Sequence, residues 1–227
     1  MHQIDTLFFD LDGTLTDNYA GITSCIIHAL ERQGHPAPAV SQLHACIGPP
    51  LRQNFSQLME TTDTAAIEQA IAHYRERFAV TGWLENTPYP GIHEALAVLR
   101  DAGYRMFVCT SKVQLYAERI IDHFELRTFF GAVYGPDLAG KLDDKRDLLR
   151  HALAEQQIAP GRALMIGDRA QDMRAARSNA LRALGVLYGY GSPEELTGAG
   201  ADALCASVER LPAAVAGLRG RNTETSS

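Results

Sequence analysis

The sequence lacks several features that would mark a specialised class of protein. Its 227 residues contain four scattered cysteines and no CxxC pair. This usage favours reduced thiols in a cytoplasmic protein over a disulfide framework, and no His/Cys cluster has the spacing of a zinc site. No apolar run approaches the length of a membrane span. The first apolar run is cut by Asp10, so we expect no signal peptide.

A basic excess is also absent. Lys and Arg number 21 against 27 Asp and Glu, which gives a net charge of -6 and a pI near 5.7. Because a nucleic-acid binder needs a basic footprint, we expect no nucleic-acid partner. The lack of a long apolar run gives the matching expectation of no membrane partner. The 46% hydrophobic and 21% charged residues are typical of a globular protein. The length allows one large domain, or a domain with a smaller insert.

Two carboxylates stand at the end of the first apolar run. Residues 7–9 read as a strand buried on both faces because the run is continuous rather than alternating. Asp10 and Asp12 follow it, and side chains at i and i+2 of an extended chain point to the same side. A cation or a shared proton would offset the repulsion between the two carboxylates. Taken alone, two aspartates at this spacing would indicate only a solvent-exposed turn after a strand. Gly13 frees the backbone to turn and lets its N–H approach an anion.

The rest of the chain divides into a helical block and an alternating part. Apolar residues recur at helical spacing, without a convincing strand, in residues 22–30, 51–59 and 67–78. Later, helices alternate with apolar strands predicted at residues 106–109, 130–134, 163–166, 183–187 and 203–205. This alternation predicts an α/β fold with a doubly wound parallel sheet covered on both faces. We assign the sheet domain to residues 1–15 and 87–227, and an inserted helical domain to residues 16–86.

Polar side chains follow three of the predicted strands. Ligands bind beyond the carboxyl ends of the strands in such sheets, so Asp10, Asp12, Thr110 and Asp168 should converge at one edge. Asp172 lies four residues after Asp168 on one face of a helix, where the helix dipole alone would also favour an acid. Together the carboxylates form an oxygen-rich cage of the kind that Mg²⁺ binds. At this edge the Thr110 hydroxyl can donate to a phosphoryl oxygen.

A lysine stands at the start of the helix predicted around residues 148–153. A cation at a helix N-terminus is unfavourable, so Lys145 indicates an anionic group nearby, although a solvated lysine would need none. Lys145 is preferred because it directly precedes the helix. Lys141 stays open as the alternative.

Four features occur in one order: the DxDGT motif that begins at Asp10, the strand-end Thr110, a lysine ahead of a helix, and the GDxxxD motif that contains Asp168. This order resembles the haloacid dehalogenase superfamily of phosphatases. The resemblance covers nearly the whole core and implies a Rossmann-like sheet with a small helical cap. The pattern is similar to phosphoglycolate phosphatases and their 5'-nucleotidase-like relatives. Ser111, where Asn is frequent, and the absence of a Lys-Pro pair leave the chemistry intact and the substrate open.

The resemblance implies a Mg²⁺-dependent phosphatase that forms an aspartyl-phosphate. Asp10 would attack phosphorus, and Asp12 would protonate the leaving oxygen and then deprotonate the attacking water. Thr110 and Lys145 would hold the phosphoryl group, whose charge the site must neutralise. The implied Mg²⁺ ligands are the Asp10 carboxylate, the Asp12 backbone carbonyl and Asp168, with Asp172 in support or binding through water.

We assign substrate choice to the helical insert, because the core motifs handle only the phosphoryl group. Arg52 follows a rigid turn and could bind a substrate carboxylate bidentately, which would favour 2-phosphoglycolate. A solvated arginine at a helix start explains it equally well. Gly13 and Ser111 are further candidate substrate contacts. A nucleotide would instead want an aromatic platform, for which Tyr19 and Phe55 are the nearby candidates.

Other functions stay open at this point. A 5'-nucleotidase-like phosphatase would share the whole motif set, and a sugar-phosphate mutase of the same superfamily would need a bisphosphorylated activator. A dehalogenase is disfavoured because it would leave Asp12 and the metal acids without a role. A non-enzymatic regulator usually lacks the nucleophile or a metal acid. We expect a cytoplasmic monomer or dimer whose partner is a small phosphorylated metabolite.

Overall fold

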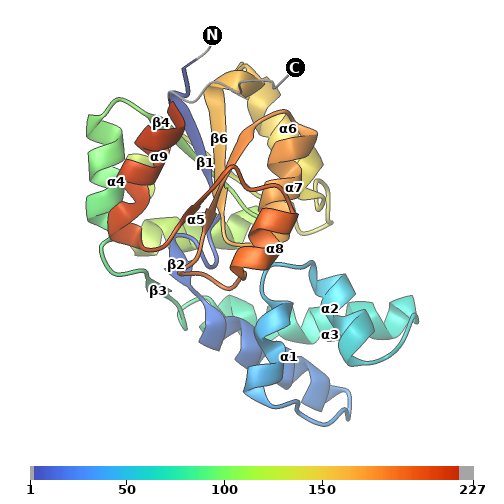
Figure 1. Cartoon of the computed structure of the whole chain (residues 1–227). Helices are drawn as coiled ribbons and strands as arrows, with labels where there is room; N and C mark the ends of the chain where they lie inside the picture. The colour runs from blue at the N-terminus through green and yellow to red at the C-terminus, as the bar shows by residue number, and fades with distance from the viewer. Residues whose placement is uncertain (1–2, 220–227) are drawn as a thin grey trace.

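The computed structural model describes residues 3–219, and its centre is a six-stranded parallel sheet in the order β5-β4-β1-β6-β7-β8 (Figure 1). The predicted α/β fold is therefore confirmed. The strands are β1 (Thr6–Phe9), β4 (Arg105–Cys109), β5 (Val133–Tyr134), β6 (Ala163–Gly167), β7 (Arg182–Val186) and β8 (Ala203–Cys205).

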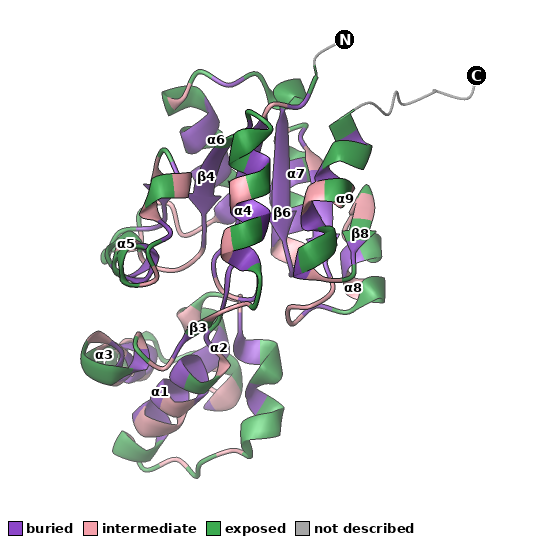
Figure 2. Cartoon of the chain, turned by 90° about the vertical axis from the view of Figure 1, so that its left-hand side faces the viewer, coloured by how far each residue is buried: buried purple, intermediate pink, exposed green. Residues whose placement is uncertain are grey.

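Helices cover both faces of the sheet because β1 is apolar on both. Leu7 and Phe9 pack into one hydrophobic cluster and Phe8 into another. Figure 2 shows the buried strands between helices whose outer faces are exposed. The helices of the first cluster are α4 (Ile92–Asp101), α5 (Gln114–His123) and α9 (Leu211–Arg219). Those of the second are α6 (Lys145–Glu155), α7 (Ala170–Ser178) and α8 (Pro193–Gly198).

The register of the central strands sets the position of the site. Phe9 lies beside Val108 of β4 and beside Ile166 of β6. The residues that follow these three strands therefore leave the sheet at the same level. Asp10, Thr110 and Asp168 meet at this carboxyl edge, as ligand sites in such sheets do.

A helical cap lies beyond this edge of the sheet (Figure 1). It has a hydrophobic cluster of its own, in which Ile26 and Phe55 are fully buried. Its helices are α1 (Tyr19–Arg32), the 3-10 helix η1 (Val40–Cys46), α2 (Leu51–Leu58), α3 (Thr64–Arg77) and the π-helix η2 (Phe78–Gly82).

Two short strands connect the cap to the sheet domain. β2 (Thr16–Asp17) pairs antiparallel with β3 (Thr87–Pro88). The expectation of no strand in residues 16–86 was therefore wrong at its first two residues, because a two-residue strand leaves no periodic pattern. The strands lie at the predicted domain boundaries, and the division of the chain there stays a prediction.

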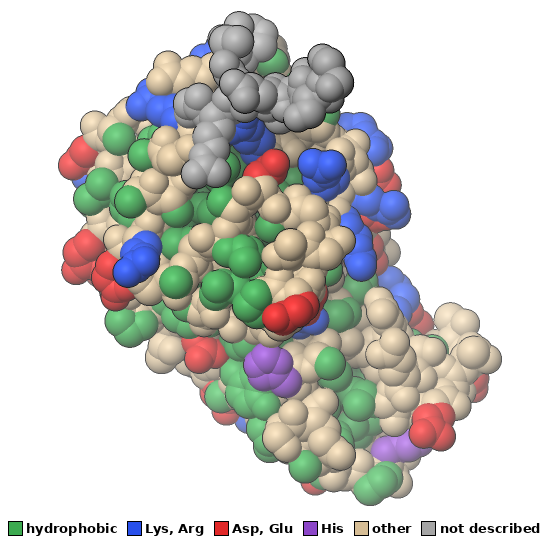
Figure 3. All heavy atoms as spheres, in the orientation of Figure 1, with side chains coloured by type: hydrophobic (Ala, Val, Ile, Leu, Met, Phe, Trp, Pro, Cys, Tyr) green, Lys and Arg blue, Asp and Glu red, His purple; other side chains and the backbone are tan. Residues whose placement is uncertain are grey.

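The strand β5 is shorter than the sequence predicts. The strand expected at residues 130–134 begins at Val133, since the 3-10 helix η3 (Arg127–Phe129) precedes it. Two further 3-10 helices are η4 (Pro160–Arg162) and η5 (Val208–Arg210). Figure 3 shows Lys and Arg side chains gathered along the edge of the core beside α6 and α7. Within residues 3–219, no helix has the length and apolar character needed to span a bilayer.

Candidate active site

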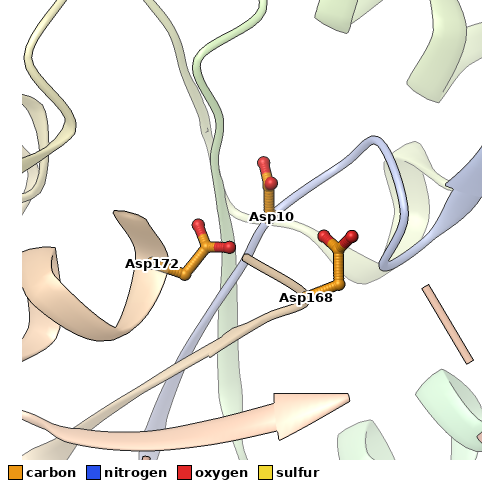
Figure 4. Close-up of side chains that lie close together, drawn as sticks. All are labelled: Asp10, Asp168 and Asp172. Carbon is orange, nitrogen blue, oxygen red and sulfur yellow. The ribbon is translucent and has the colours of Figure 1, made fainter. Parts of the chain in front are cut away.

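Three buried carboxylates point toward one another at the carboxyl edge of the sheet (Figure 4). Asp10 follows β1, Asp168 follows β6 and Asp172 lies in the first turn of α7. One oxygen from each lies within 4.8 Å of the others. The structure thus brings together three of the four acids that were predicted to form the cation cage, Asp12 being the exception.

Glycines allow the backbone to close around Asp168. Gly13 has a φ of +84°, and a Cβ atom there would overlap the Asp168 carboxylate. A Cβ atom at Gly189 would also overlap Asp168. The carboxylate accepts hydrogen bonds from Thr14 Oγ1 at 3.3 Å and from the Tyr190 N–H at 2.9 Å, which fix its orientation. Gly13 is therefore a packing requirement of the acid site, and its predicted contact with substrate stays a prediction.

Lys145 joins two members of the carboxylate cluster. Its Nζ lies 3.0 Å from Asp10 Oδ1 and forms an ion pair with Asp172, and its side chain is 3% exposed. Burial alone would lower the pKa of Lys145, but the facing carboxylates of Asp10 and Asp172 raise this pKa above its usual value. The lysine is thus held in its charged form. Lys141 lies in the preceding loop and is exposed.

The charge balance of the cluster fits a divalent cation. Burial, with the nearby charges of Asp172 and Asp10, raises the pKa of Asp168 well above its usual value. Burial likewise raises the pKa of Asp172 to about 6. Three carboxylates and one ammonium group leave a formal charge of -2. Carboxylate oxygens with no His or Cys in the cluster are the donors that Mg²⁺ prefers, so the residues present fit this ion.

The Asp12 carboxylate, which was predicted in the acidic cage, lies outside the carboxylate cluster because it pairs with a lysine instead. Its backbone carbonyl as a Mg²⁺ ligand stays a prediction. Its Oδ1 accepts a hydrogen bond from Asn18 Nδ2 at 3.2 Å, and its Oδ2 lies 2.8 Å from Lys112 Nζ. Lys112 is nearly buried and also lies over the Phe78 ring, 4.5 Å from its centroid. Neither Lys112 nor Asn18 was predicted from the sequence. The place of Lys112, two residues after the strand-end Thr110, was the available signal.

A pocket of about 100 Å³ opens between the cap and this edge of the sheet. Thr110 and Ser111 line it together with Asp10, and the Thr110 hydroxyl accepts a hydrogen bond from the Lys112 N–H at 3.2 Å. The cap side of the pocket is largely apolar and aromatic. The aromatic residues of the lining are Tyr74 and Phe78 of the cap and Tyr116 of α5 in the core.

Comparison with known proteins identifies the family. The profile of the haloacid dehalogenase-like hydrolases matches residues 7–186. The chain belongs to this family. A 5'-nucleotidase of Pseudomonas aeruginosa is 42% identical to this hydrolase over 205 residues, which is 90% of this chain and 92% of the relative. A phosphoglycolate phosphatase of Agrobacterium fabrum is 32% identical over 191 residues, 80% of each chain.

A solved structure agrees with the same assignment. The crystal structure of a predicted phosphatase from Clostridium acetobutylicum matches this hydrolase with a TM-score of 0.91 at 37% identity, covering 96% of this chain and 100% of that one. The predicted superfamily and the predicted enzyme class, a phosphoric monoester hydrolase, are confirmed.

Arg52 of this hydrolase lies away from the carboxylate pocket. Its guanidinium pairs with Glu68 at 2.5 Å and with Asp143 at 3.1 Å, and its side chain is 48% exposed. A contact between Arg52 and substrate stays a prediction, and it would require the loss of both ion pairs. Phe55 is fully buried inside the cap and Tyr19 is outside the pocket lining. Neither residue therefore lines the pocket as the aromatic platform that a nucleotide would want.

The segment that carries Asp168 and Asp172 also contacts the cap. Arg169, which follows Asp168, donates a hydrogen bond to the Ile47 carbonyl of the cap and pairs with Glu195 at 2.9 Å. The Arg169 N–H donates to the Asp172 carboxylate at 3.0 Å. Arg169 thus links the position of the cap to the acid site. Sequence patterns gave no signal for this link, because Arg169 and Ile47 are far apart in the chain.

Proposed function

We propose that this hydrolase is a Mg²⁺-dependent phosphatase of small phosphate monoesters that works through an aspartyl-phosphate. The observation that carries the proposal is the position of Asp10. Its carboxylate faces the pocket, contacts Lys145 and shares the acid cluster with Asp168 and Asp172. A nucleophile, a fixed positive charge and a fitting metal site therefore surround one point.

The first half of the reaction transfers the phosphoryl group to Asp10. Oδ1 of Asp10 is held by the Leu11 N–H at 2.8 Å and by Lys145, so we assign the attack on phosphorus to Oδ2. The P–O bond to the leaving group breaks as the new bond forms. Lys145 and the Thr110 hydroxyl hold the phosphoryl oxygens during the transfer. When bound, Mg²⁺ supplies positive charge that offsets the charge of the phosphoryl group and the carboxylates.

Asp12 moves the protons in both halves. It gives its proton to the leaving oxygen, then takes a proton from the water that attacks the aspartyl-phosphate and releases inorganic phosphate. Asn18 and Lys112 hold one carboxylate oxygen each, so the side chain has a fixed direction at the mouth of the pocket. Asn18 precedes the first cap helix, which connects this acid–base residue to the position of the cap.

The size of the pocket supports a small leaving group. Its volume of about 100 Å³ is well below the roughly 300–1,000 Å³ of sites for drug-sized ligands. The name of the Agrobacterium relative supports 2-phosphoglycolate as the substrate. A second candidate is a 5'-nucleotidase, which the Pseudomonas relative and the aromatic side chains of the pocket favour. A nucleoside would need the cap to move away from the core.

Phosphate release with Mg²⁺ tests the proposal and separates the candidates. We expect the highest kcat/KM with 2-phosphoglycolate, lower values with nucleoside monophosphates and sugar phosphates, and no turnover in chelator. Ca²⁺ should replace Mg²⁺ poorly because it takes more ligands at longer distances. A preference for nucleoside monophosphates would favour the nucleotidase, and dependence on a bisphosphorylated activator would favour a mutase. Full activity in chelator would contradict the metal assignment. The cytoplasmic location and a monomeric or dimeric state stay predictions.

A further inference from the structure

Arg75 brings an unsatisfied hydrogen-bond donor to the pocket. It lies on the cap helix α3 and lines the same pocket as Asp10. Its Nη1 donates to the Leu138 carbonyl of the core at 3.1 Å, which anchors the guanidinium between the two domains. Its Nε is buried and has no hydrogen-bond partner within residues 3–219. A buried donor without an acceptor costs free energy, so an acceptor that binds the Arg75 Nε–H would be favoured.

The other cap arginines near the core have their charges neutralised. Arg77 forms a two-bond pair with Glu85, with both distances at 2.8 Å, and Arg52 has two acidic partners. Lys112, the other cation of the pocket lining, pairs with Asp12. Arg75 has no acidic partner in the part of the chain that the structure describes. It is therefore the pocket cation whose charge the described residues do not balance.

We propose that Arg75 selects substrates whose leaving group carries an anion, a carboxylate foremost. This inference rests on the proposed phosphatase function and assigns the residue that recognises the leaving group. The guanidinium matches a carboxylate through two parallel N–H bonds. Because Nη1 is used by Leu138, the remaining edge is formed by Nε and Nη2. On the cap side of the pocket Arg75 is the charged residue among apolar and aromatic neighbours, so the lining residues of the cap offer an anion no second cation.

A pair of substrates that differ in one group tests the assignment. 2-Phosphoglycolate carries a carboxylate where 2-hydroxyethyl phosphate carries a neutral hydroxymethyl group. Arg75→Met should raise KM for 2-phosphoglycolate by roughly ten- to a hundredfold, the usual strength of a charge-assisted bond, with kcat nearly unchanged. Turnover of 2-hydroxyethyl phosphate should stay the same, which also shows that the variant folds. Arg75→Lys keeps the positive charge but lacks the two parallel N–H donors of the guanidinium, so it should give an intermediate KM.

Arg52→Met is the matched control, since it removes a nearby cap arginine whose charge is already paired. If Arg75 is the recognition residue, Arg52→Met should leave both KM values unchanged, whereas the Arg52 contact predicted from the sequence would instead give a selective loss with 2-phosphoglycolate. Equal weakening of both substrates by Arg75→Met would overturn the proposal and assign Arg75 to support of the cap through Leu138. A selective loss in Arg52→Met alone would also overturn it and assign recognition to Arg52. So would a wild-type enzyme that does not prefer the anionic substrate.

A binding measurement keeps this test separate from the proposed function. Calorimetric titration of Asp10→Asn protein with each phosphate ester, in Mg²⁺, needs no turnover. Tighter binding of 2-phosphoglycolate that is lost on adding Arg75→Met would support the recognition role even if the wild type released no phosphate. Equal affinities for the two esters would overturn the recognition role even if the wild type proved to be a phosphatase.

Discussion

Replacing Lys145 by methionine should destabilise the metal-free enzyme and nearly abolish its activity. The change removes the ammonium group that lies 3.0 Å from Asp10 and pairs with Asp172, inside a site where all three groups are buried. Removing one partner of a buried ion pair costs roughly 3–5 kcal/mol, because the charge left behind stays out of water. At roughly 2–4 °C per kcal/mol for a chain of this size, the melting temperature should fall by about 6–20 °C.

The expected loss of activity has a separate cause. Removing one fixed donor that holds developing charge lowers kcat by roughly 10²–10³. Thermal melts in EDTA and phosphate-release assays in Mg²⁺ measure the two effects independently. Mg²⁺ should recover part of the melting temperature, since a bound cation compensates the carboxylates that Lys145 leaves unpaired. It should not recover kcat, because the contact of Lys145 with the phosphoryl group is still missing.

Lys141→Met is the matched control, because this exposed lysine lies four residues earlier, in the loop that precedes α6. Its melting temperature and kcat should stay close to those of the wild type. A tenfold or smaller loss of kcat in Lys145→Met, with a large loss in Lys141→Met, would refute the assignment of the phosphate lysine. An unchanged melting temperature of Lys145→Met in EDTA would refute the energetic reasoning.

Two further predictions concern other parts of the molecule. Gly13→Ala should weaken Mg²⁺ binding and activity, since its Cβ would overlap Asp168 at a φ of +84°; a calorimetric titration that gives wild-type affinity would count against this. The hydrogen bond from Arg77 lowers the pKa of Glu85 below 4.5, so this pair stabilises the fold above that pH and the effect disappears as pH falls further. At pH 7 the free energy of unfolding of Glu85→Gln should therefore be lower than that of the wild type, by at most ~1 kcal/mol for so exposed a pair. Near pH 3 the two proteins should have the same stability. A stability difference that does not change with pH would contradict the prediction.

The meeting of Asp10, Thr110 and Asp168 could be predicted because each follows a recognisable strand. Continuous apolar runs end directly before Asp10, Thr110 and Asp168, and parallel strands bring such ends to one edge. Lys145 was predictable for a related reason, since a lysine at a helix start needs a nearby anion. These inferences use only short stretches of sequence and the geometry of a parallel sheet.

The substrate side of the site could not be predicted in the same way. The cap carries several arginines, and what separates Arg52 from Arg75 is a partner distant in sequence. Arg52 pairs with Asp143, 91 residues away, whereas the side-chain hydrogen bond of Arg75 within residues 3–219 goes to the carbonyl of Leu138. No local pattern encodes either contact. The same holds for the ion pair of Lys112 with Asp12, because the side-chain direction depends on how the cap packs above it.

Chemical trapping of the phosphoryl group tests the central claim most directly. Wild-type enzyme mixed with labelled substrate and Mg²⁺, then quenched in acid within milliseconds, should carry acid-stable label that peptide mapping places on Asp10. Asp10→Asn protein, which should fold like the wild type, should carry none. Label on any other residue, or full turnover by Asp10→Asn, would contradict the mechanism.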